Sequence, residues 1–430
     1  MPAKCAAPRA TAHLSQEYRT PAWEQRKLGE LASKRIEKNT NRIKETFTNS
    51  AEHGVVSQLD YFDHDITNDA NIGNYSVVYP DDFIYNPRIS AVAPCGPINR
   101  NKLGRNGVMS PLYTVFSVDD TIDKLYLEHY FKTSRWHQFM FLEGNSGARS
   151  DRFSISDSIF FEMPIQCPVL EEQELIASFF DHLDSLITLH QRKYDKLCVL
   201  KKSMLDKMFP KGGSLYPEIR FAGFTDPWEQ RKLGELFVIG GSGGTPSATN
   251  ASYYGGDIPF LGISDIKNRD ITITAKSITE KGLENSAAWI IPAGSICLAM
   301  YASVGKAGIN RVSLATSQAF YNMVFEDETL RDFIYTRLEK ADTDNEWNPL
   351  ISTGTQANLN ADKVKSFRIL LPSSDERRLI AKYFADLDSL ITLHQRKYDG
   401  CANPLFLERR ISCRKPSHQN RCSATTTPSG

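Results

Sequence analysis

The sequence predicts an α+β protein in which two mixed α/β units, related by a pseudo-twofold axis, are separated by two long antiparallel helices that form a coiled coil. Two repeats support this prediction. The segment Asp184–Asp195 recurs letter for letter as Asp388–Asp399, and Trp23–Leu31 recurs as Trp228–Leu236. A period of about 204 residues indicates duplicated domains rather than a solenoid of short repeats. The residues between the shared segments hardly match. The two units therefore have the same segments at their ends, called here the frame, and different sequences between these segments, called here the content.

The composition is that of an ordinary globular protein. With 430 residues, 41% hydrophobic and 24% charged, the chain is long enough for two to four domains. A formal net charge of zero argues against coating nucleic acid by bulk charge, but it permits local basic patches. Eight cysteines form no Cys-x-x-Cys pair, and neither a signal-peptide core nor an apolar run of about 18 residues is found. We therefore expect a cytoplasmic protein with reduced thiols.

Composition and periodicity divide the chain into six segments. We expect a disordered tail at 1–22, a first unit at 23–170, a central repeated helix at 171–211, a linker and second unit at 212–374, a shorter distal repeated helix at 375–399, and a divergent, disordered tail at 400–430.

The first unit is predicted to consist of short strands and one helix. We expect a short helix or helix–strand transition at Trp23–Leu31, strands at Val55–Val56, Tyr75–Tyr79, Phe83–Tyr85 and Leu112–Val118, a helix at Thr121–Leu142, a polar loop at Gly144–Arg149, and a closing strand at Ile159–Val169. The second unit is predicted to have a turn-forming loop at Ile239–Pro246, strands at Ile258–Ile263, Ile271–Thr274 and Ser295–Met300, a helix at Glu328–Lys340, a polar loop at Ser352–Leu359, and a closing strand at Phe367–Pro372.

Both repeated helices have apolar residues at alternating spacings of three and four, which is typical of a helix-pair seam. The predicted seam consists of Ile176, Phe180, Leu183, Ile187, His190, Tyr194 and Leu197 on the first helix, and of Ile380, Phe384, Leu387, Ile391, His394 and Tyr398 on the second. We interpret His190 as a core histidine rather than a metal ligand, because no second histidine lies one turn away.

Several motifs together indicate a family. They are the two Trp-Glu-Gln-Arg-Lys-Leu-Gly-Glu-Leu segments, the Ile-Ala-x-Phe/Tyr-Phe helices that start at Ile176 and Ile380, and the segments Lys201–Leu205, Pro217–Phe224, Tyr85–Pro87, Gly107–Pro111, Thr245–Ser247, Gly255–Leu261, Gly294–Ser295 and Gly354–Leu359. This set, which covers about Trp23–Asp399, resembles the specificity (S) subunit of a type I restriction-modification enzyme.

The resemblance implies a sequence-specific DNA-binding subunit without catalytic activity. Each unit would be a target-recognition domain that reads one half of a bipartite DNA target, and the helices would set the spacing. The implied partners are double-stranded DNA, two methyltransferase (M) subunits and restriction (R) subunits. S-adenosylmethionine, ATP and Mg²⁺ would belong to those partners, with no cofactor or metal in this chain. Two departures stand out: the second helix stops near Asp399, and no Pro-Glu-Ile-Arg-Phe lead precedes Trp23.

Candidate DNA contacts were chosen as polar residues on loops, where base edges and phosphates are most accessible. For each one, an ordinary solvated side chain is the alternative, and a contact to phosphate would position the protein without specifying sequence. The candidates are Arg100, Asn101, Lys102, Arg105, Asn145, Ser146 and Arg149 in the first unit, and Lys267, Arg269, Ser303, Lys306, Thr353, Thr355, Gln356 and Asn358 in the second.

Other functions have weaker support. An adenine methyltransferase needs a second proline and an aromatic residue after Asn86-Pro87, and Asp81-Asp82 lacks the Glu-x-Lys partner of a common nuclease. The Gly-rich Ile239–Pro246 lacks the Gly-Lys-Ser/Thr ending of a phosphate-binding loop. Cys413, His418 and Cys422 lack a well-spaced fourth zinc ligand. The remaining alternatives are an inactive or silent specificity allele that serves as a recombination reservoir, and a coiled-coil scaffold that binds no DNA.

Overall fold

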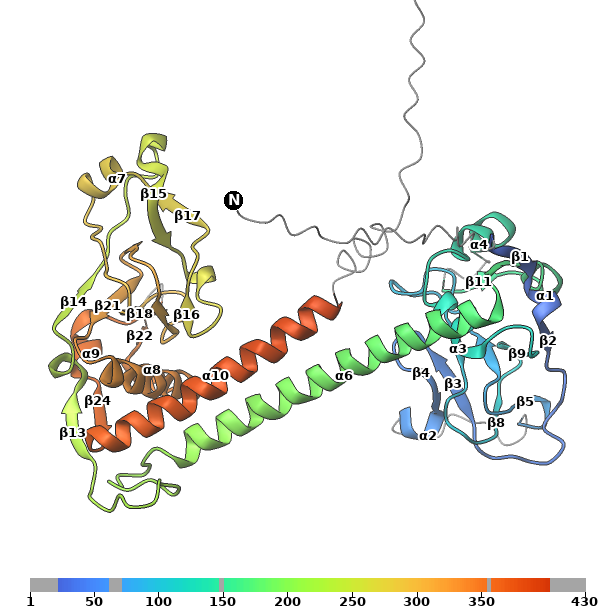
Figure 1. Cartoon of the computed structure of the whole chain (residues 1–430), viewed down its shortest axis with the longest axis horizontal. Coiled ribbons are helices and arrows are strands. Elements are labelled where there is room, and N and C mark those ends of the chain that lie inside the picture. The colour runs from blue at the N-terminus through green and yellow to red at the C-terminus, as the bar shows by residue number, and fades with distance from the viewer. Residues whose placement is uncertain (1–21, 62–71, 147–150, 354–356, 403–430) are drawn as a thin grey trace, which may run out of the picture. The chain divides into compact units, whose positions relative to one another are not determined.

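The computed structural model describes residues 22–61, 72–146, 151–353 and 357–402 (Figure 1). The chain divides into two compact units, unit 1 up to Ser185 and unit 2 from Leu186. Each unit mixes helices with sheets, as the sequence predicts. The expected tails lie outside the described residues, apart from Ala22 and residues 400–402. Within the described part of the chain, no helix has both the length and the apolar character needed to cross a bilayer.

Unit 1 begins and ends on two neighbouring strands. Strand β1 (Glu24–Lys27) pairs antiparallel with β12 (Pro164–Cys167), with Glu24 opposite Cys167 and Lys27 opposite Pro164. Helix α1 (Leu28–Leu31) follows β1 directly and buries Leu28 and Leu31. The predicted helix–strand transition at Trp23–Leu31 is therefore confirmed.

Between these two strands, unit 1 has a four-stranded sheet in the order β2-β9-β6-β7 and three separate strand pairs. The sheet consists of β2 (Ala32–Lys34), β9 (Thr114–Val118), β6 (Phe83–Tyr85) and β7 (Ile98–Arg100). The pairs are β3 (Phe47–Ser50) with β4 (Gly54–Ser57), β5 (Ser76–Val78) with β8 (Gly107–Met109), and β10 (Asn145–Ser146) with β11 (Phe153–Ser154). Short helical segments lie at α2 (Gln58–Tyr61) and η1 (Ile72–Asn74).

The single helix predicted at Thr121–Leu142 is wrong, because two helices form there: α3 (Lys124–Phe131) and α4 (His137–Glu143). The side chain of Asp123 caps α3 by accepting a hydrogen bond from the Tyr126 backbone. The chain turns at Thr133–Ser134, and Trp136 folds back so that its Nε1 donates to the Phe131 carbonyl at 3.0 Å. The closing strand also starts later than predicted, since Ser156 caps the short helix α5 (Asp157–Phe160).

Unit 2 repeats the frame of unit 1. Strand β13 (Glu229–Lys232) pairs antiparallel with β24 (Arg368–Leu371), and Lys232 lies opposite Arg368. The content between them differs from that of unit 1. A five-stranded sheet has the order β14 (Ile239–Ser242), β21 (Phe320–Val324), β18 (Ile296–Ala299), β19 (Ala307–Asn310) and β16 (Asp270–Ile271). A three-stranded sheet has the order β17 (Lys276–Ile278), β15 (Tyr254–Leu261) and β20 (Ala315–Thr316).

The helices of unit 2 include α7 (Glu280–Glu284), α8 (Glu328–Thr343) and α9 (Ala361–Ser366), with single turns at η2 (Leu233–Glu235), η3 (Ala251–Tyr253), η4 (Ile263–Asp265) and η5 (Asn348–Leu350). A further strand pair is formed by β22 (Ser352–Thr353) and β23 (Ala357–Asn358). The Gly-rich segment predicted as a loop begins with the edge strand β14. A Cβ on Gly243, just after this strand, would lie 1.9 Å from the Thr316 carbonyl oxygen, so only glycine fits there.

The two repeated helices are α6 (Leu170–Lys207) and α10 (Ser374–Ala402). Helix α10 continues three residues beyond the stop predicted at Asp399, because one glycine at Gly400 costs only about 1 kcal/mol of helix propensity. In unit 2 the two helices run antiparallel: His190 meets His394, Lys201 meets Asp388, and Phe209, just past α6, meets Phe384. As residue numbers rise along α6, those of its partners on α10 fall.

The core of unit 2 joins this helix pair to the β-rich content. Leu205, Met208 and Phe209 pack with Trp228 and with Phe333 of α8, and all five are at most 4% exposed. The Phe209 ring lies 5.8 Å from the Trp228 ring and 5.6 Å from the Phe333 ring. The end of α6 is thereby anchored in the core of unit 2.

Candidate nucleic-acid interface

The predicted seam residues differ in burial along the helices. Ile380, Phe384 and Leu387 are buried in the core of unit 2. The others are half-buried: Ile176, Phe180, Leu183, Ile187, His190, Tyr194, Leu197, Ile391, His394 and Tyr398. Ile176 packs against the core of unit 1, and the Phe180 ring lies 5.6 Å from His129.

Two histidines from equivalent positions of the repeat meet across the helix pair. The Nδ1 atoms of His190 and His394 lie 2.9 Å apart, so one ring donates and the other must keep a lone pair. Desolvation and then the charge of His190 lower the pKa of His394, and Lys193 and Lys397 act in the same direction. In the part of the chain that the structure describes, no group of three or more His, Cys, Asp or Glu residues could hold a metal ion.

We expect the helix pair to lose stability as the pH falls below about 6.5, the ordinary histidine pKa. A histidine whose pKa is lowered on folding binds its proton more weakly in the folded state, so protonation favours unfolding. The urea midpoint should be lower at pH 5.5 than at pH 7.5. In the double variant His190→Gln, His394→Gln the pH difference should shrink; an unchanged difference would show that other groups cause it.

In unit 1, Arg100 and Lys102 flank a buried carboxylate. The Arg100 side chain is 15% exposed and forms ion pairs with Glu128 at 2.8 Å and with Asp81 at 2.9 Å. Lys102 is 57% exposed and also contacts Glu128, at 3.1 Å. Burial alone would raise the pKa of Glu128, but the charges of Arg100 and Lys102 hold it below the ordinary value. Arg100 is therefore held inside the protein, and Lys102 is the accessible member of this cluster.

Asn101 is a correction to the predicted set. Its side chain is buried and donates to the carbonyl oxygens of Tyr79 at 2.9 Å and Arg105 at 3.1 Å. A buried amide with both hydrogens bonded to backbone has no donor left for a base. Arg105 itself is 51% exposed and pairs with Glu45 at 3.0 Å.

Two of the remaining candidates of unit 1 form the strand β10, which pairs with β11. Asn145 is exposed and lies opposite Ser154, while Ser146 lies opposite Phe153. Arg149 lies outside the described residues. The polar loop predicted at Gly144–Arg149 therefore begins as a short strand.

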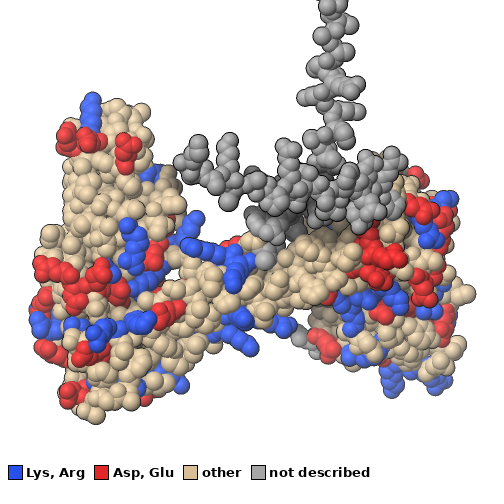
Figure 2. Space-filling model, in the orientation of Figure 1, with Lys and Arg blue, Asp and Glu red and all other residues tan. Residues whose placement is uncertain are grey.

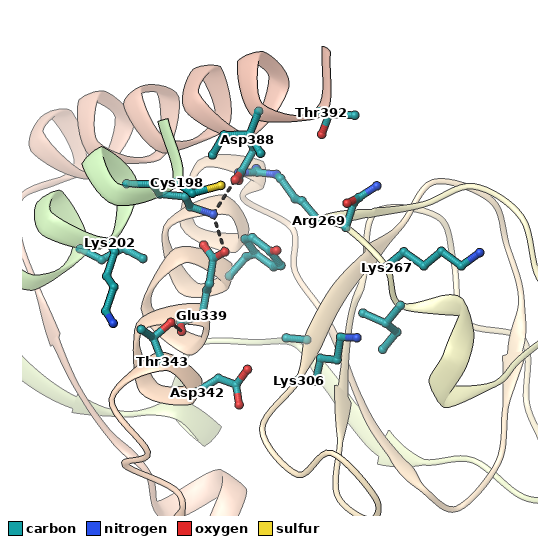
Figure 3. A pocket seen from close by; sticks show the side chains of 17 residues that line it. Cys198, Lys202, Lys267, Arg269, Lys306, Glu339, Asp342, Thr343, Asp388 and Thr392 are labelled. Carbon is teal, nitrogen blue, oxygen red and sulfur yellow. Dashed lines mark hydrogen bonds and ion pairs between the residues drawn. The ribbon is translucent and has the colours of Figure 1, made fainter. Parts of the chain in front are cut away.

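In unit 2, Arg269 is the second correction. Its side chain is only 7% exposed, pairs with Asp332 at 3.0 Å, lies 3.8 Å from Asp388 and stacks over the Tyr335 ring at 5.0 Å. These contacts leave the guanidinium no access to a base edge. Lys267, two residues earlier, is exposed, and Figure 3 shows it extending away from Asp388.

Arg269 belongs to a charge cluster that lines a cavity of about 390 Å³ (Figure 3). Lys201 of α6 donates to both Glu339 of α8 and Asp388 of α10. Burial raises the pKa of Glu339; Lys201 opposes this shift, and the negative charge of Asp388 adds to it. One lysine therefore links three helices, and Arg269 connects them to the segment that carries Lys267.

Ser303 and Lys306 lie on the turn between β18 and β19. Ser303 is exposed and has a φ of 61°, a conformation that is uncommon for residues other than glycine. Its carbonyl accepts a hydrogen bond from the Lys306 backbone at 3.1 Å. Lys306 is half-buried at the edge of the same cavity. Backbone strain of this kind is frequent at binding sites.

Two of the last four candidates lie in the strand pair β22–β23. Thr353 is in β22, opposite Ala357, and Asn358 is in β23, opposite Ser352. Thr355 and Gln356 lie outside the described residues. Sequence reasoning missed the acidic partners Glu128, Glu339 and Asp388. For Asp388 a signal existed, since it lies in the segment that repeats letter for letter.

The visible surface of each unit has no uniform charge. Figure 2 shows Lys and Arg side chains interspersed with Asp and Glu side chains on the face seen there. This distribution fits the formal net charge of zero. On this face, contact with a polyanion would depend on individual Lys and Arg side chains rather than on a uniformly basic surface.

Comparison with known proteins identifies the class. The chain matches the family described as "Type I restriction modification DNA specificity domain" over residues 21–198 and again over 225–400, and it belongs to this family. The resemblance predicted from the sequence is confirmed, as is the prediction of a specificity subunit rather than an enzyme.

Two relatives support this assignment, and one solved structure shows the fold. The specificity subunit of the type I restriction enzyme MjaIX from Methanocaldococcus jannaschii is 32% identical over 185 residues, which cover 42% of each chain. The HindI specificity subunit from Haemophilus influenzae is 32% identical over 34% of this chain and 32% of the relative. The chain thus spans less than half the length of these relatives. The type I S subunit from M. genitalium has a TM-score of 0.52 at 14% identity, over 92% of this chain and 97% of that one, which shows the fold.

Proposed function

We propose that the chain is a sequence-specific DNA-binding subunit that directs a type I methyltransferase and endonuclease complex to a bipartite DNA target. The observation that carries this proposal is the identical frame around different content. β1–β12 and β13–β24 pair the same Glu-Gln-Arg-Lys segment in the same register, yet they enclose a four-stranded and a five-stranded main sheet. If each unit reads one half of the DNA target, two units with different content would read two different half-sites. The comparisons give no support to a silent allele or a scaffold.

Polar residues of each unit are proposed to contact DNA, apart from the buried Asn101 and Arg269 and the charge-paired Arg100. We retain Lys102, Arg105, Asn145, Ser146 and Arg149 in unit 1, and Lys267, Ser303, Lys306, Thr353, Thr355, Gln356 and Asn358 in unit 2. Arg100, the last residue of β7, is proposed to hold the end of this strand rather than to read bases, because its charge is already paired. The lysines suit phosphate contacts, and the amides suit base edges.

The helices are proposed to form a coiled-coil spacer between units related by a pseudo-twofold axis, and to bind two M subunits. A second apolar stripe supports the partner count. Leu186 and Leu189 of α6 are 47% and 44% exposed, and the repeat equivalents Leu390 and Leu393 of α10 are each 44% exposed. Because the same pair of exposed leucines occurs on both helices, each helix can bind one copy of the same partner.

The chemistry is proposed to come from those partners. The M subunits would bring S-adenosylmethionine, and R subunits would bring ATP and Mg²⁺. A complex of this kind acts on DNA in the cytoplasm, which is the proposed location. No residue of this chain is assigned a catalytic role.

Co-purification with its cognate M subunit, followed by mapping of methylated adenines, tests the whole proposal. We expect a stable complex and methylation within one split motif. Binding of the M subunit without methylation would contradict the recognition role, and failure to bind would contradict the docking role of the helices.

Lys267→Ala is expected to weaken DNA binding about equally for target and non-target duplexes. A lysine that contacts phosphate contributes a salt-dependent, sequence-independent term, and its loss lowers the slope of log affinity against log salt by about 1. Binding measured at several salt concentrations checks this. Lys281→Ala, an exposed lysine on α7, is the matched control and should change neither quantity. A loss confined to the target duplex would reassign Lys267 to base reading.

A further inference from the structure

The two copies of the repeat differ in how well one helix face is covered. In unit 2, Trp228 is 1% exposed and Phe384 is 0% exposed. At the equivalent positions of unit 1, Trp23 is 41% exposed and Phe180 is half-buried. Phe179, the equivalent of Tyr383, is 55% exposed. Trp228 and Phe384 are therefore buried in unit 2, whereas the equivalent Trp23 and Phe180 of unit 1 are more exposed.

The structure shows what covers this face in unit 2. The end of α6 and the residues after it lie on Trp228 and α10. Phe209 contacts the rings of Trp228 and Phe384 at 5.8 and 6.2 Å, and Phe221 contacts Tyr383 at 6.4 Å. The covering segment is thus Leu197–Phe224, in which a basic amphipathic helix is followed by an irregular stretch of turns and bends that contains Arg220.

Two ion pairs fix this cover at its ends. Arg220 donates to both carboxylate oxygens of Glu376 at 2.7 and 2.8 Å, and Lys201 donates to Asp388. Bidentate pairs of this type are the stronger and more specific ones. Both acidic residues therefore bind a cation that the covering segment supplies.

The same two acids are present on the open side. Glu172 is the equivalent of Glu376, and it accepts a hydrogen bond from Trp23 Nε1 at 3.3 Å in place of an arginine. Asp184 is the equivalent of Asp388; its side chain is 53% exposed, against 15% for Asp388, and it pairs with Lys132 at 3.1 Å. The apolar surface and the anchoring charges of the docking site are both in place.

We propose that this surface of unit 1, formed by Glu172, Phe179, Phe180 and Asp184 of α6 together with Trp23, and called here the open face, binds a basic amphipathic helix supplied by a separate polypeptide. The partner would carry large apolar residues at the spacing of Leu205, Met208 and Phe209, a lysine one turn before them, and an arginine after the helix. The inference rests on the repeat within this chain and does not depend on DNA recognition.

A fluorescent synthetic peptide with the sequence of Leu197–Phe224 tests this proposal on the full-length chain. We expect saturable micromolar binding, read by anisotropy, with no DNA present. A peptide with serine at the positions of Leu205, Met208 and Phe209 should bind at least about tenfold more weakly, since each 1.4 kcal/mol is a factor of ten.

Substitutions in the chain locate the site. Phe179→Asp should weaken binding of the peptide by about tenfold or more, because it puts a charge in the apolar contact. Val199→Asp is the matched control, since Val199 is an exposed apolar residue of α6 outside the open face, and binding should not change. Absence of saturable binding, as would follow if another part of this chain already covers the face, overturns the proposal. Binding that is insensitive to Phe179→Asp overturns it as well.

Discussion

Lys201→Met is expected to lower the free energy of unfolding by about 3 to 5 kcal/mol, the usual cost of removing one partner from a buried charge cluster. Lys201 is the shared donor to Glu339 and Asp388, and its side chain is 10% exposed. Without it, the carboxylates of Glu339 and Asp388 would lose the cation that they share, although Arg269 still lies 3.8 Å from Asp388. Denaturation by urea, followed by far-UV circular dichroism, measures the loss.

The neighbouring Lys202 provides the control. It is exposed and points away from Asp388 in Figure 3, so Lys202→Met should change stability by less than about 0.5 kcal/mol. Acid should partly rescue Lys201→Met. Burial already raises the pKa of Glu339, and a carboxyl group with a raised pKa in the folded state binds its proton more tightly there, so folding gains as the pH falls. A loss equal in both variants would show that the cluster does not stabilise the helix contacts.

Phe384→Ala is expected to cost about 3 to 5 kcal/mol, the range for removing a fully buried phenylalanine. Phe384 is 0% exposed and packs on Phe209, so truncation leaves a cavity where α10 meets the end of α6. The repeat supplies an internal control: Phe180→Ala removes the equivalent ring from unit 1, where it is half-buried, and should cost clearly less. Urea denaturation of both variants measures the two losses of unfolding free energy. Equal losses would contradict the conclusion that Phe384 is more deeply buried than Phe180.

The repeated frame could be predicted from the sequence with accuracy because its signals are local and occur twice. The bounds of α6 and α10 follow from periodic apolar residues, and the Trp23–Leu31 transition follows from identity with Trp228–Leu236. Helix α8 was predicted to end at Lys340 and ends at Thr343. The secondary structure predicted from the sequence was wrong where helix caps or tertiary contacts determine it. One such place is Thr133–Ser134, where the predicted single helix is divided into α3 and α4. Another is Ile239, where an edge strand forms by pairing with β21.

The candidate interface was harder to predict, because residue type gives no information on burial. Asn101 and Arg269 have side chains suited to reading bases, yet the fold uses the first to hold backbone carbonyls and the second to join Asp332 and Asp388. The role of Arg269 has no local signature, since its partner Asp388 lies about 120 positions away in the chain. Asn101 bonds both locally, to Arg105, and at a distance, to Tyr79. Lys102, Arg105 and Lys267 remain predictions that a binding experiment can test.

The strand pairs β1–β12 and β13–β24 have a consequence for engineering. Lys27 lies opposite Pro164, and Lys232 lies opposite Arg368, so each variable unit leaves the frame and returns to it at adjacent residues. Closing a longer insert between fixed ends costs little extra entropy, because the cost grows only with the logarithm of its length. Chimeras joined at these four residues should accept modules of different size while the two strand pairs and helices keep their geometry. Each module is then an exchangeable cassette.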